Sequence, residues 1–193
     1  LGDVYKRQLL DYIEDTQKAY QVPLQPLKTY SLADFLVLDN QTRRNLEITQ
    51  TVRDGSLYGS LLWALDRTCT PMGGRALRRW LLQPLLDKKG IIARQDTLAE
   101  LKQNPPLRQD LRELLKNIYD LERIAGRVGA GTANARDLLA LAQSLVRLAD
   151  LADLASQGNS LYLRALQKVN PELEQLGKKV IANLVEAPPL HLK

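Results

Sequence analysis

The sequence is poor in the residues that bind metals, form disulfides or perform acid-base catalysis. It contains one cysteine, Cys69, and one histidine, His191, in 193 residues. A single cysteine cannot close an internal disulfide, and no CxxC or Cys/His spacing is present for zinc. We therefore expect no metal ligand in this chain, and a reducing interior, the cytoplasm, as its location.

Long apolar runs are also absent. Arg, Lys, Asp or Glu interrupts every leucine-rich stretch well before the roughly 18 residues that a transmembrane helix requires. We therefore expect no membrane partner. Hydrophobic residues nevertheless make up 45% of the chain, which is enough for one helical domain with a core.

Aromatic residues are few: seven Tyr, two Trp and one Phe. None of them forms the repeated stacking platform with basic neighbours that single-strand binders use. The net charge of +5 would suit an anionic partner, but 27 basic residues are interleaved with 22 acidic ones. The composition is therefore only a weak indication of nucleic-acid binding, and direct base readout is not indicated.

Motifs for nucleotide chemistry or nucleophilic catalysis are missing as well. The one Gly-Lys pair, Gly177-Lys178, lacks the preceding glycine and the following Ser or Thr of a P-loop. Asp120 and Glu122 could be imagined as a catalytic carboxylate pair, yet positions two apart diverge around a helix, and Arg123 adjoins them. A salt-bridged or solvated face is the better interpretation, so we expect no catalytic residue, no bound cofactor and no enzyme activity in this chain.

The two ends indicate a fragment of a longer protein. The chain has no initiator Met, and it stops shortly after Pro188 and Pro189. Residues 1–8 are polar and lack the helical period of the neighbouring residues 9–20, so we interpret them as a non-native junction.

Apolar spacing and capping residues predict helices along most of the chain. Those in the first half are expected over residues 9–20, 41–51 after Asp39, 59–67, 71–83 after Thr70, and from Asp87 to Asn104. The exception is the apolar run Phe35–Leu38, which is expected to form a single short strand.

The apolar spacing in the second half of the sequence predicts longer helices that pack against one another. One apolar stripe is continuous from Leu107 to Val128, and a second runs from Leu138 to Ala155. Glycines at 126–131 between them are either a hinge or a plain turn. Shorter helices are expected over 159–169 and 171–186, the latter with a stripe of Leu173, Leu176, Val180 and Leu184. The predicted class is all-α with antiparallel helices and at most one short strand.

Three segments go beyond a generic helical pattern. Residues 38–49 (LDNQTRRNLEIT) and 65–87 (LDRTCTPMGGRALRRWLLQPLLD) resemble the signature at the start of the core domain of the MutS family, in the same order and at a similar interval. Residues 118–141 (IYDLERIAGRVGAGTANARDLLAL) resemble a later segment of that core. The resemblance implies a core helical domain over residues 9–155 and, over 156–193, the start of a lever arm whose C-terminal helix protrudes toward a clamp outside the chain.

The resemblance also implies a role. The fragment would be the structural and signal-transmitting core and lever of a DNA mismatch-recognition ATPase, linking its DNA-binding clamp to its ATPase. ATP and Mg²⁺ would be cofactors of the parent protein only. The partners implied are the connector, clamp and ATPase domains, mismatched duplex DNA bound through the parent, and a second parent subunit in a homodimer.

Particular positions match the family signature and are expected to have structural or interdomain roles. They are Asp39, Thr42, Arg43, Arg44, Glu47, Thr70, Pro71, Met72, Gly73, Arg75, Trp80, Asp120 and Arg123. Arg44 and Glu47 are spaced to pair on one helix. Trp63, Leu77, Trp80, Leu81 and Leu85 are expected to be core or interface anchors.

Two other functions remain open. Gly73 and Gly74 at a helix start, followed by arginines, could form an anion nest, although close helix packing is the preferred interpretation. An independent, basic helical nucleic-acid-binding module would then make weak phosphate contacts through Arg75, Arg78, Arg79, Lys88 and Lys89. The other open function is an enzyme with an unrecognised site.

Overall fold

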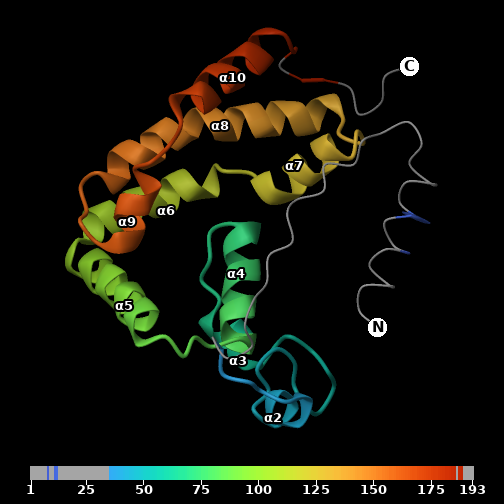
Figure 1. Ribbon diagram of the computed structural model, residues 1–193, viewed down its shortest axis with the longest axis vertical. Helices are drawn as coiled ribbons and strands as arrows, with labels where there is room; N and C mark the ends of the chain where they lie inside the picture. Colours follow the sequence, from blue (N-terminus) through green and yellow to red (C-terminus); the bar gives the residue numbers. More distant parts are fainter. Residues whose placement is uncertain (1–7, 9–10, 13–34, 186, 189–193) are drawn as a thin grey trace.

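The protein is all-α in a computed structural model that describes residues 8, 11–12, 35–185 and 187–188 (Figure 1). Within these residues there is no sheet, which confirms the predicted class. The expected strand at Phe35–Leu38 is reduced to an isolated antiparallel bridge between Phe35 and Leu85, beside which the Leu36 N–H donates to the Pro84 carbonyl at 2.8 Å. The expected junction at 1–8 and helix at 9–20 lie almost wholly outside the described residues.

A bundle of antiparallel helices forms the larger part of the fold (Figure 1). Its members are α6 (Pro105–Lys116), α7 (Leu121–Gly129), α8 (Ala135–Ala155), α9 (Leu161–Leu166) and α10 (Pro171–Ala182). The long helix α8 lies in the middle, with α6 and α7 along one side and α10 along the other. Leu107, Leu111, Ile118, Leu151, Ala155 and Leu163 form the buried core cluster of this bundle.

The break between α6 and α7 differs from the sequence prediction of one helix through Val128. Residues 117–120 leave the helix, and the Tyr119 N–H donates to the Ser144 hydroxyl of α8 at 3.0 Å. This hydroxyl in turn donates to the Ala140 carbonyl at 2.9 Å. The break changes the register, so that Ile124 is buried while Val128 is 41% exposed.

The glycines after α7 form a turn. Gly131 has a φ of 67°, a left-handed conformation that glycine adopts without a Cβ clash, and the Thr132 N–H closes the turn on the Arg127 carbonyl at 2.9 Å. A hinge role for this turn stays a prediction.

The C-terminal helix α10 packs along α8, so the expectation that it protrudes as a lever is wrong for the described residues. The close approach occurs at Gly177, which is buried; a Cβ there would lie 2.8 Å from the Ala142 carbonyl oxygen and 3.0 Å from Val146 Cγ2. The absence of a side chain lets the two backbones meet. The helix ends at Ala182 rather than at residue 186, and Leu176 of the predicted stripe is 49% exposed.

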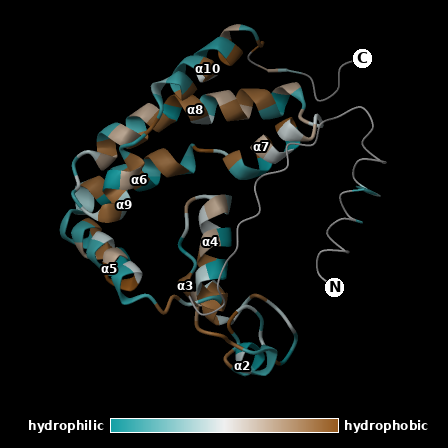
Figure 2. Cartoon of the chain, viewed as in Figure 1, coloured by the Kyte–Doolittle hydropathy of each residue, from teal (hydrophilic) through white to brown (hydrophobic). Residues whose placement is uncertain are grey.

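A second body, which we call the arm, consists of α2 (Asn40–Asn45), α3 (Leu61–Leu65) and α4 (Pro71–Leu82). Helix α5 (Lys88–Gln103) leads from the arm to the bundle, and it packs on α6 and α9. Figure 2 shows apolar residues concentrated on α6 and α8, whereas α2 is largely hydrophilic.

Both short arm helices are shorter than predicted. The predicted helix 41–51 ends at Asn45, because Glu47 adopts a φ of 47° and turns the chain so that Ile48 becomes buried. The predicted helix 59–67 covers only Leu61–Leu65. The Leu61 and Leu62 N–H groups donate to the Glu47 and Ile48 carbonyls, so contacts distant in sequence replace helix propagation.

The helix starts predicted at Asp39, Thr70, Asp87 and Asn170 are confirmed, because they depend on local capping chemistry: each side chain accepts a backbone N–H from the first turn of its helix. Asn104, which was expected only to end α5, also caps the start of α6 in the same way. Pro71, Pro105 and Pro171 occupy first-turn positions, where the missing N–H costs nothing.

Candidate interdomain site on the arm

Arg75 of α4 joins the arm to the bundle through two carboxylates. Its Nη1 and Nη2 donate to Asp120 Oδ2 and Oδ1, both at 2.7 Å, which is a bidentate pair. Its Nη2 also donates to Glu122 Oε2 at 2.6 Å, and Nε lies 3.2 Å from the same oxygen. Two signature residues that are 45 positions apart, Arg75 and Asp120, therefore meet in the fold.

The expected divergence of Asp120 and Glu122 is wrong, because Asp120 is the N-cap residue of α7 rather than a helical position. Its non-helical backbone directs its carboxylate toward Arg75 together with that of Glu122. The salt-bridged interpretation is confirmed. Arg123, another signature residue, lies nearby, with its Nε 3.7 Å from Asp120 Oδ2.

The electrostatics of this contact favour the ionised forms. The hydrogen bonds from Arg75, reinforced by the Arg123 N–H, lower the pKa of Asp120 from 3.8 to about 2, against the opposing effect of burial. The bonds to Asp120 and Glu122 in turn raise the pKa of Arg75. This contact is consequently charged throughout the physiological pH range.

Two further contacts link the same two bodies. Arg112 Nη1 of α6 donates to the Arg67 carbonyl at 3.0 Å, just before α4. Met72, a signature residue on the first turn of α4, packs against the core cluster of the bundle. The arm is therefore fixed near the N-terminal half of α4, whereas the other end of α4 carries Arg78 and Arg79, which are exposed.

The first signature segment is organised by its own capping bonds. Asp39 accepts the Thr42 N–H at 2.6 Å, and this bond lowers the pKa of Asp39. The expected Arg44–Glu47 ion pair is wrong, because the turn at Glu47 sends its carboxylate to the Val52 N–H at 2.6 Å. Arg44 remains exposed on α2.

The glycines at the start of α4 do not form an open anion nest. The Gly73 N–H donates to the Thr70 hydroxyl at 2.9 Å, so this amide is already satisfied. A Cβ at Gly73 would lie 3.1 Å from that hydroxyl and 3.3 Å from Thr68 Cβ. Close packing, the preferred interpretation, therefore accounts for Gly73. The guanidinium of Arg75, for which a weak phosphate contact was expected, is bound by two carboxylates, so a phosphate would have to compete with them.

Neither tryptophan lies in the core, which was one of the two locations expected for them. Trp63 is 44% exposed, with its ring centroid 4.4 Å from that of Tyr58. Trp80 is 41% exposed, and the guanidinium carbon of Arg94 lies 3.8 Å from its ring centroid. Leu77, Leu81 and Leu85 are half-buried. An interface role for Trp63 and Trp80 stays a prediction.

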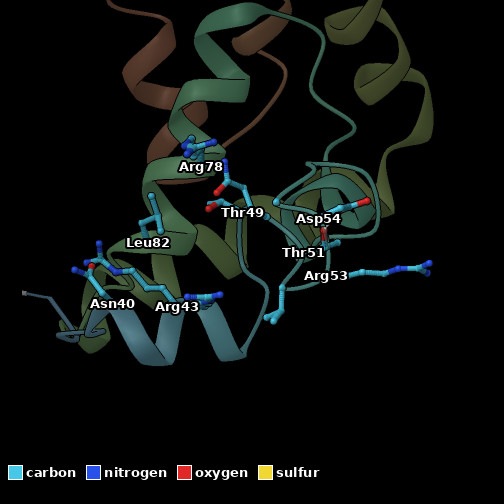
Figure 3. A pocket seen from close by; sticks show the side chains of 12 residues that line it. Asn40, Arg43, Thr49, Thr51, Arg53, Asp54, Arg78 and Leu82 are labelled. Atoms are coloured by element: carbon cyan, nitrogen blue, oxygen red, sulfur yellow. Dashed lines mark hydrogen bonds between the residues drawn. The ribbon is translucent and has the colours of Figure 1, made fainter.

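A cleft lined by arginines separates α2, the loop over residues 49–55 and α4 (Figure 3). Its volume is about 710 Å³, and Arg43, Arg44, Arg53 and Arg78 line it. An adjoining hollow of about 330 Å³ is lined by Arg43, Arg75, Arg78 and Arg79. We call the two together the arginine cleft. Sequence reasoning missed Arg53, although the excess of arginine over acid in residues 43–53 was visible.

The remaining residues proposed as phosphate contacts, Lys88 and Lys89, are exposed on the first turn of α5 and do not line the arginine cleft. Across the part of the chain that the structure describes, no group of three or more His, Cys, Asp or Glu side chains could hold a metal ion. Likewise, none of the described helices is long and apolar enough to cross a membrane.

Comparison with known proteins places this arrangement in a family. Residues 41–193 match the family model of MutS domain III. The chain belongs to the MutS family. It is 76% identical to a DNA mismatch repair protein MutS of Microcystis aeruginosa and 73% identical to one of Synechocystis, each over 96% of this chain. The MutS protein of Trichormus variabilis is 68% identical over the same share.

These relatives are much longer than this chain, which spans about a fifth of their length, 21% for the first two and 22% for the third. The comparisons confirm the resemblance carried by the three sequence segments. Residues 41–193 are therefore a MutS domain III, in which Arg75, Asp120 and Met72 connect the two bodies.

Proposed function

We propose that this chain is the structural and signal-transmitting module of a DNA mismatch-recognition ATPase. In the parent protein it would link the DNA-binding clamp to the ATPase, with the connector, clamp and ATPase domains as its direct partners. Mismatched duplex DNA would bind through the parent, which we propose to be a homodimer that uses ATP and Mg²⁺. This chain itself would supply no catalytic residue and no cofactor ligand.

The observation that carries the proposal is the bidentate contact of Arg75 with Asp120. The first half of α4 is held against α7 by Arg75 and against the core cluster by Met72. A displacement applied to the C-terminal half of α4, which is exposed, would therefore pass to α7 as a rigid-body movement. Packed helices shift as units rather than deform.

The independent nucleic-acid-binding module remains a second candidate, favoured by the exposure of Arg78, Arg79, Lys88 and Lys89. Phosphate-led binding weakens steeply as salt rises, with a slope that scales with the number of contacts. A salt-dependent titration of this chain with duplex DNA separates the two candidates. Micromolar binding at physiological salt would favour the second.

The transmission proposal is tested in the full-length protein that contains this chain. Replacing Arg75 with Gln (Arg75→Gln) removes the charged contact between arm and bundle. We expect the stimulation of ATP hydrolysis by mismatched DNA to fall severalfold, while basal hydrolysis and DNA affinity stay unchanged.

The matched control is Arg127→Gln. Arg127 makes a bidentate contact of the same kind with Asp137, at 2.6 and 3.0 Å, but between α7 and α8 inside the bundle. Arg127→Gln should leave the stimulation of ATP hydrolysis by mismatched DNA unchanged. Unchanged stimulation in Arg75→Gln, or an equal loss in both variants, would refute transmission through α4.

A further inference from the structure

The arginine cleft holds more positive charge than the residues around it neutralise. Arg43, Arg44, Arg53, Arg78 and Arg79 line it. Within the described residues, none of these five guanidinium groups makes an ion pair with a carboxylate within 4.0 Å. Arg75, which lines the smaller hollow, differs from these five because Asp120 and Glu122 bind its guanidinium.

The acidic side chains near the cleft are already bound to other groups. Asp54 lines the cleft, but it accepts the Thr51 hydroxyl and the Ser56 N–H, the latter at 3.1 Å. Asp39 caps α2 through the Thr42 N–H. Neither carboxylate compensates an arginine by direct contact, so the cleft presents a concentrated positive potential to its surroundings.

Arg43 supplies a second, independent observation. Its side chain lines both hollows of the cleft, and its Nε is buried without a hydrogen-bond partner among the described residues. Buried polar groups in proteins are almost always hydrogen-bonded, and a buried charged donor is especially costly to leave unpaired. An acceptor that entered the cleft would satisfy this donor after a small rotation of the Arg43 side chain.

The lining of the cleft distinguishes among anionic ligands. Figure 3 shows Arg43 from α2 and Arg78 from α4 on two sides of the cleft, with Leu82 between them, while Arg53 extends away from the loop. Its lining residues include no aromatic side chain, so a nucleotide base would have none of them to stack on. The Gly55 N–H, which a phosphate could use, donates to the Thr51 carbonyl at 3.1 Å.

An acidic peptide suits these features better than nucleic acid does. Carboxylates match the planar fork of arginine, and Arg43 and Arg78 offer two such forks around one space. Leu82 and Val52 add apolar surface for the intervening side chains. The volume of about 710 Å³ accommodates several side chains of an extended segment.

We propose that the arginine cleft is a docking site for an acidic peptide segment of a protein partner, with its carboxylates bound by Arg43 and Arg78. This goes beyond the proposed function, because a rigid arm could transmit a displacement without binding any anion here. Since Arg43 and Arg78, rather than the contact of Arg75 with Asp120, would bind the peptide, failure of this proposal would leave the transmission proposal standing, and the reverse is also true.

The test uses labelled hexaglutamate and the whole 193-residue chain, with binding followed by fluorescence anisotropy at low salt. We expect saturable binding, and a loss of about tenfold in affinity or more in the double variant Arg43→Gln/Arg78→Gln, equivalent to about 1.4 kcal/mol. Arg78→Gln alone, at an exposed position, should give a smaller loss and keeps the test valid if the double variant is unstable.

A matched control removes the same charge elsewhere. Arg108→Gln/Arg164→Gln replaces two exposed arginines on α6 and α9 that lie outside the cleft. It should bind hexaglutamate as the unchanged chain does. Equal weakening in the two double variants, or no binding by the unchanged chain, would overturn the proposal. Displacement of hexaglutamate by lower concentrations of a short DNA duplex would also overturn it, by showing that phosphate is the preferred ligand.

Discussion

The bundle and the arm are stabilised in different ways, although both consist of capped helices. In the bundle, α8 runs for 21 residues and contributes five buried residues. In the arm, neither α2 nor α4 has a buried residue, and Leu46, Tyr58 and Trp63 are more than 40% exposed. The bundle is therefore stabilised by apolar burial, and the arm mainly by caps, turn hydrogen bonds and charged contacts. The arm is therefore expected to unfold locally at a lower free-energy cost than the bundle.

The largest effect is expected from removing a core side chain of the bundle. Leu107 is 1% exposed, so Leu107→Ala should lower the free energy of unfolding by roughly 2 to 5 kcal/mol through lost burial and a residual cavity. Urea denaturation measures it. The same change at Leu98, which is 67% exposed on α5, should stay within about 0.5 kcal/mol. Similar losses at both positions would contradict the placement of the core.

The next effect concerns the contact of α10 with α8. In Gly177→Ala the new Cβ would meet the Ala142 carbonyl oxygen at 2.8 Å, a backbone atom that cannot move aside cheaply. We expect a loss of roughly 1 to 3 kcal/mol, measured by thermal or urea unfolding.

The matched change has the opposite sign. Gly126 lies within α7, and a Cβ there would meet nothing within 4 Å. Gly126→Ala should therefore stabilise the protein by roughly 0.4 to 1 kcal/mol, since alanine restricts the unfolded chain and favours helix. If both substitutions stabilised the protein, α10 would not lie against α8.

A smaller and more local effect is expected in the arm. Asp39→Ala removes the acceptor of the Thr42 N–H and should cost about 1 kcal/mol. Hydrogen exchange should show faster exchange in α2, with α8 unchanged. A comparable change in α8 protection would mean that arm and bundle unfold as one unit, which would remove the distinction between them.

The smallest effect is a pH dependence of the contact between the two bodies. The pKa of Asp120 in the folded protein, about 2, lies below its ordinary value of 3.8. The ionised carboxylate therefore contributes fully to the free energy of unfolding above about pH 4, and this contribution is lost as the pH falls toward 2. Because Arg75 is one-third exposed, solvent screens the pair. Stability should thus fall less between pH 5 and pH 2 in Asp120→Asn than in the unchanged chain.

Asp110→Asn provides the control for this pH series. Asp110 is exposed on α6 and, within the described residues, takes part in no ion pair. This variant should keep the full pH dependence. If Asp110→Asn flattened the profile as much as Asp120→Asn does, general charge rather than the Arg75 contact would be responsible.

Local chemistry was predictable from the sequence, and contacts between distant segments were not. Thr70-Pro71 and Asn170-Pro171 act within one helical turn, so both helix starts were correct. The break before α7 was missed because apolar spacing continues through it, and its stabilising partner, Ser144, lies 25 positions away. The packing of α10 was missed because Gly177 carries no side chain to extend an apolar stripe.

The candidate site shows the same limit. The family signature correctly singled out Arg75 and Asp120, but nothing in either segment indicates that they bind each other across 45 positions. The spacing of Arg44 and Glu47 predicted a pair, which the left-handed turn at Glu47 prevents. Arg53 belongs to the arginine cleft only because that turn brings the 49–55 loop beside α4.

The only cysteine of the sequence lies at the base of α4, immediately before its capping residue Thr70. Cys69 is half-buried, so the rate at which a bulky thiol reagent modifies its sulfur depends on how often the start of α4 opens to solvent. The rate of thiol modification therefore reports on opening at this one position, free of interference from any other sulfhydryl in these 193 residues. Measured as partners are added one by one, it would show which of them holds the start of α4 closed.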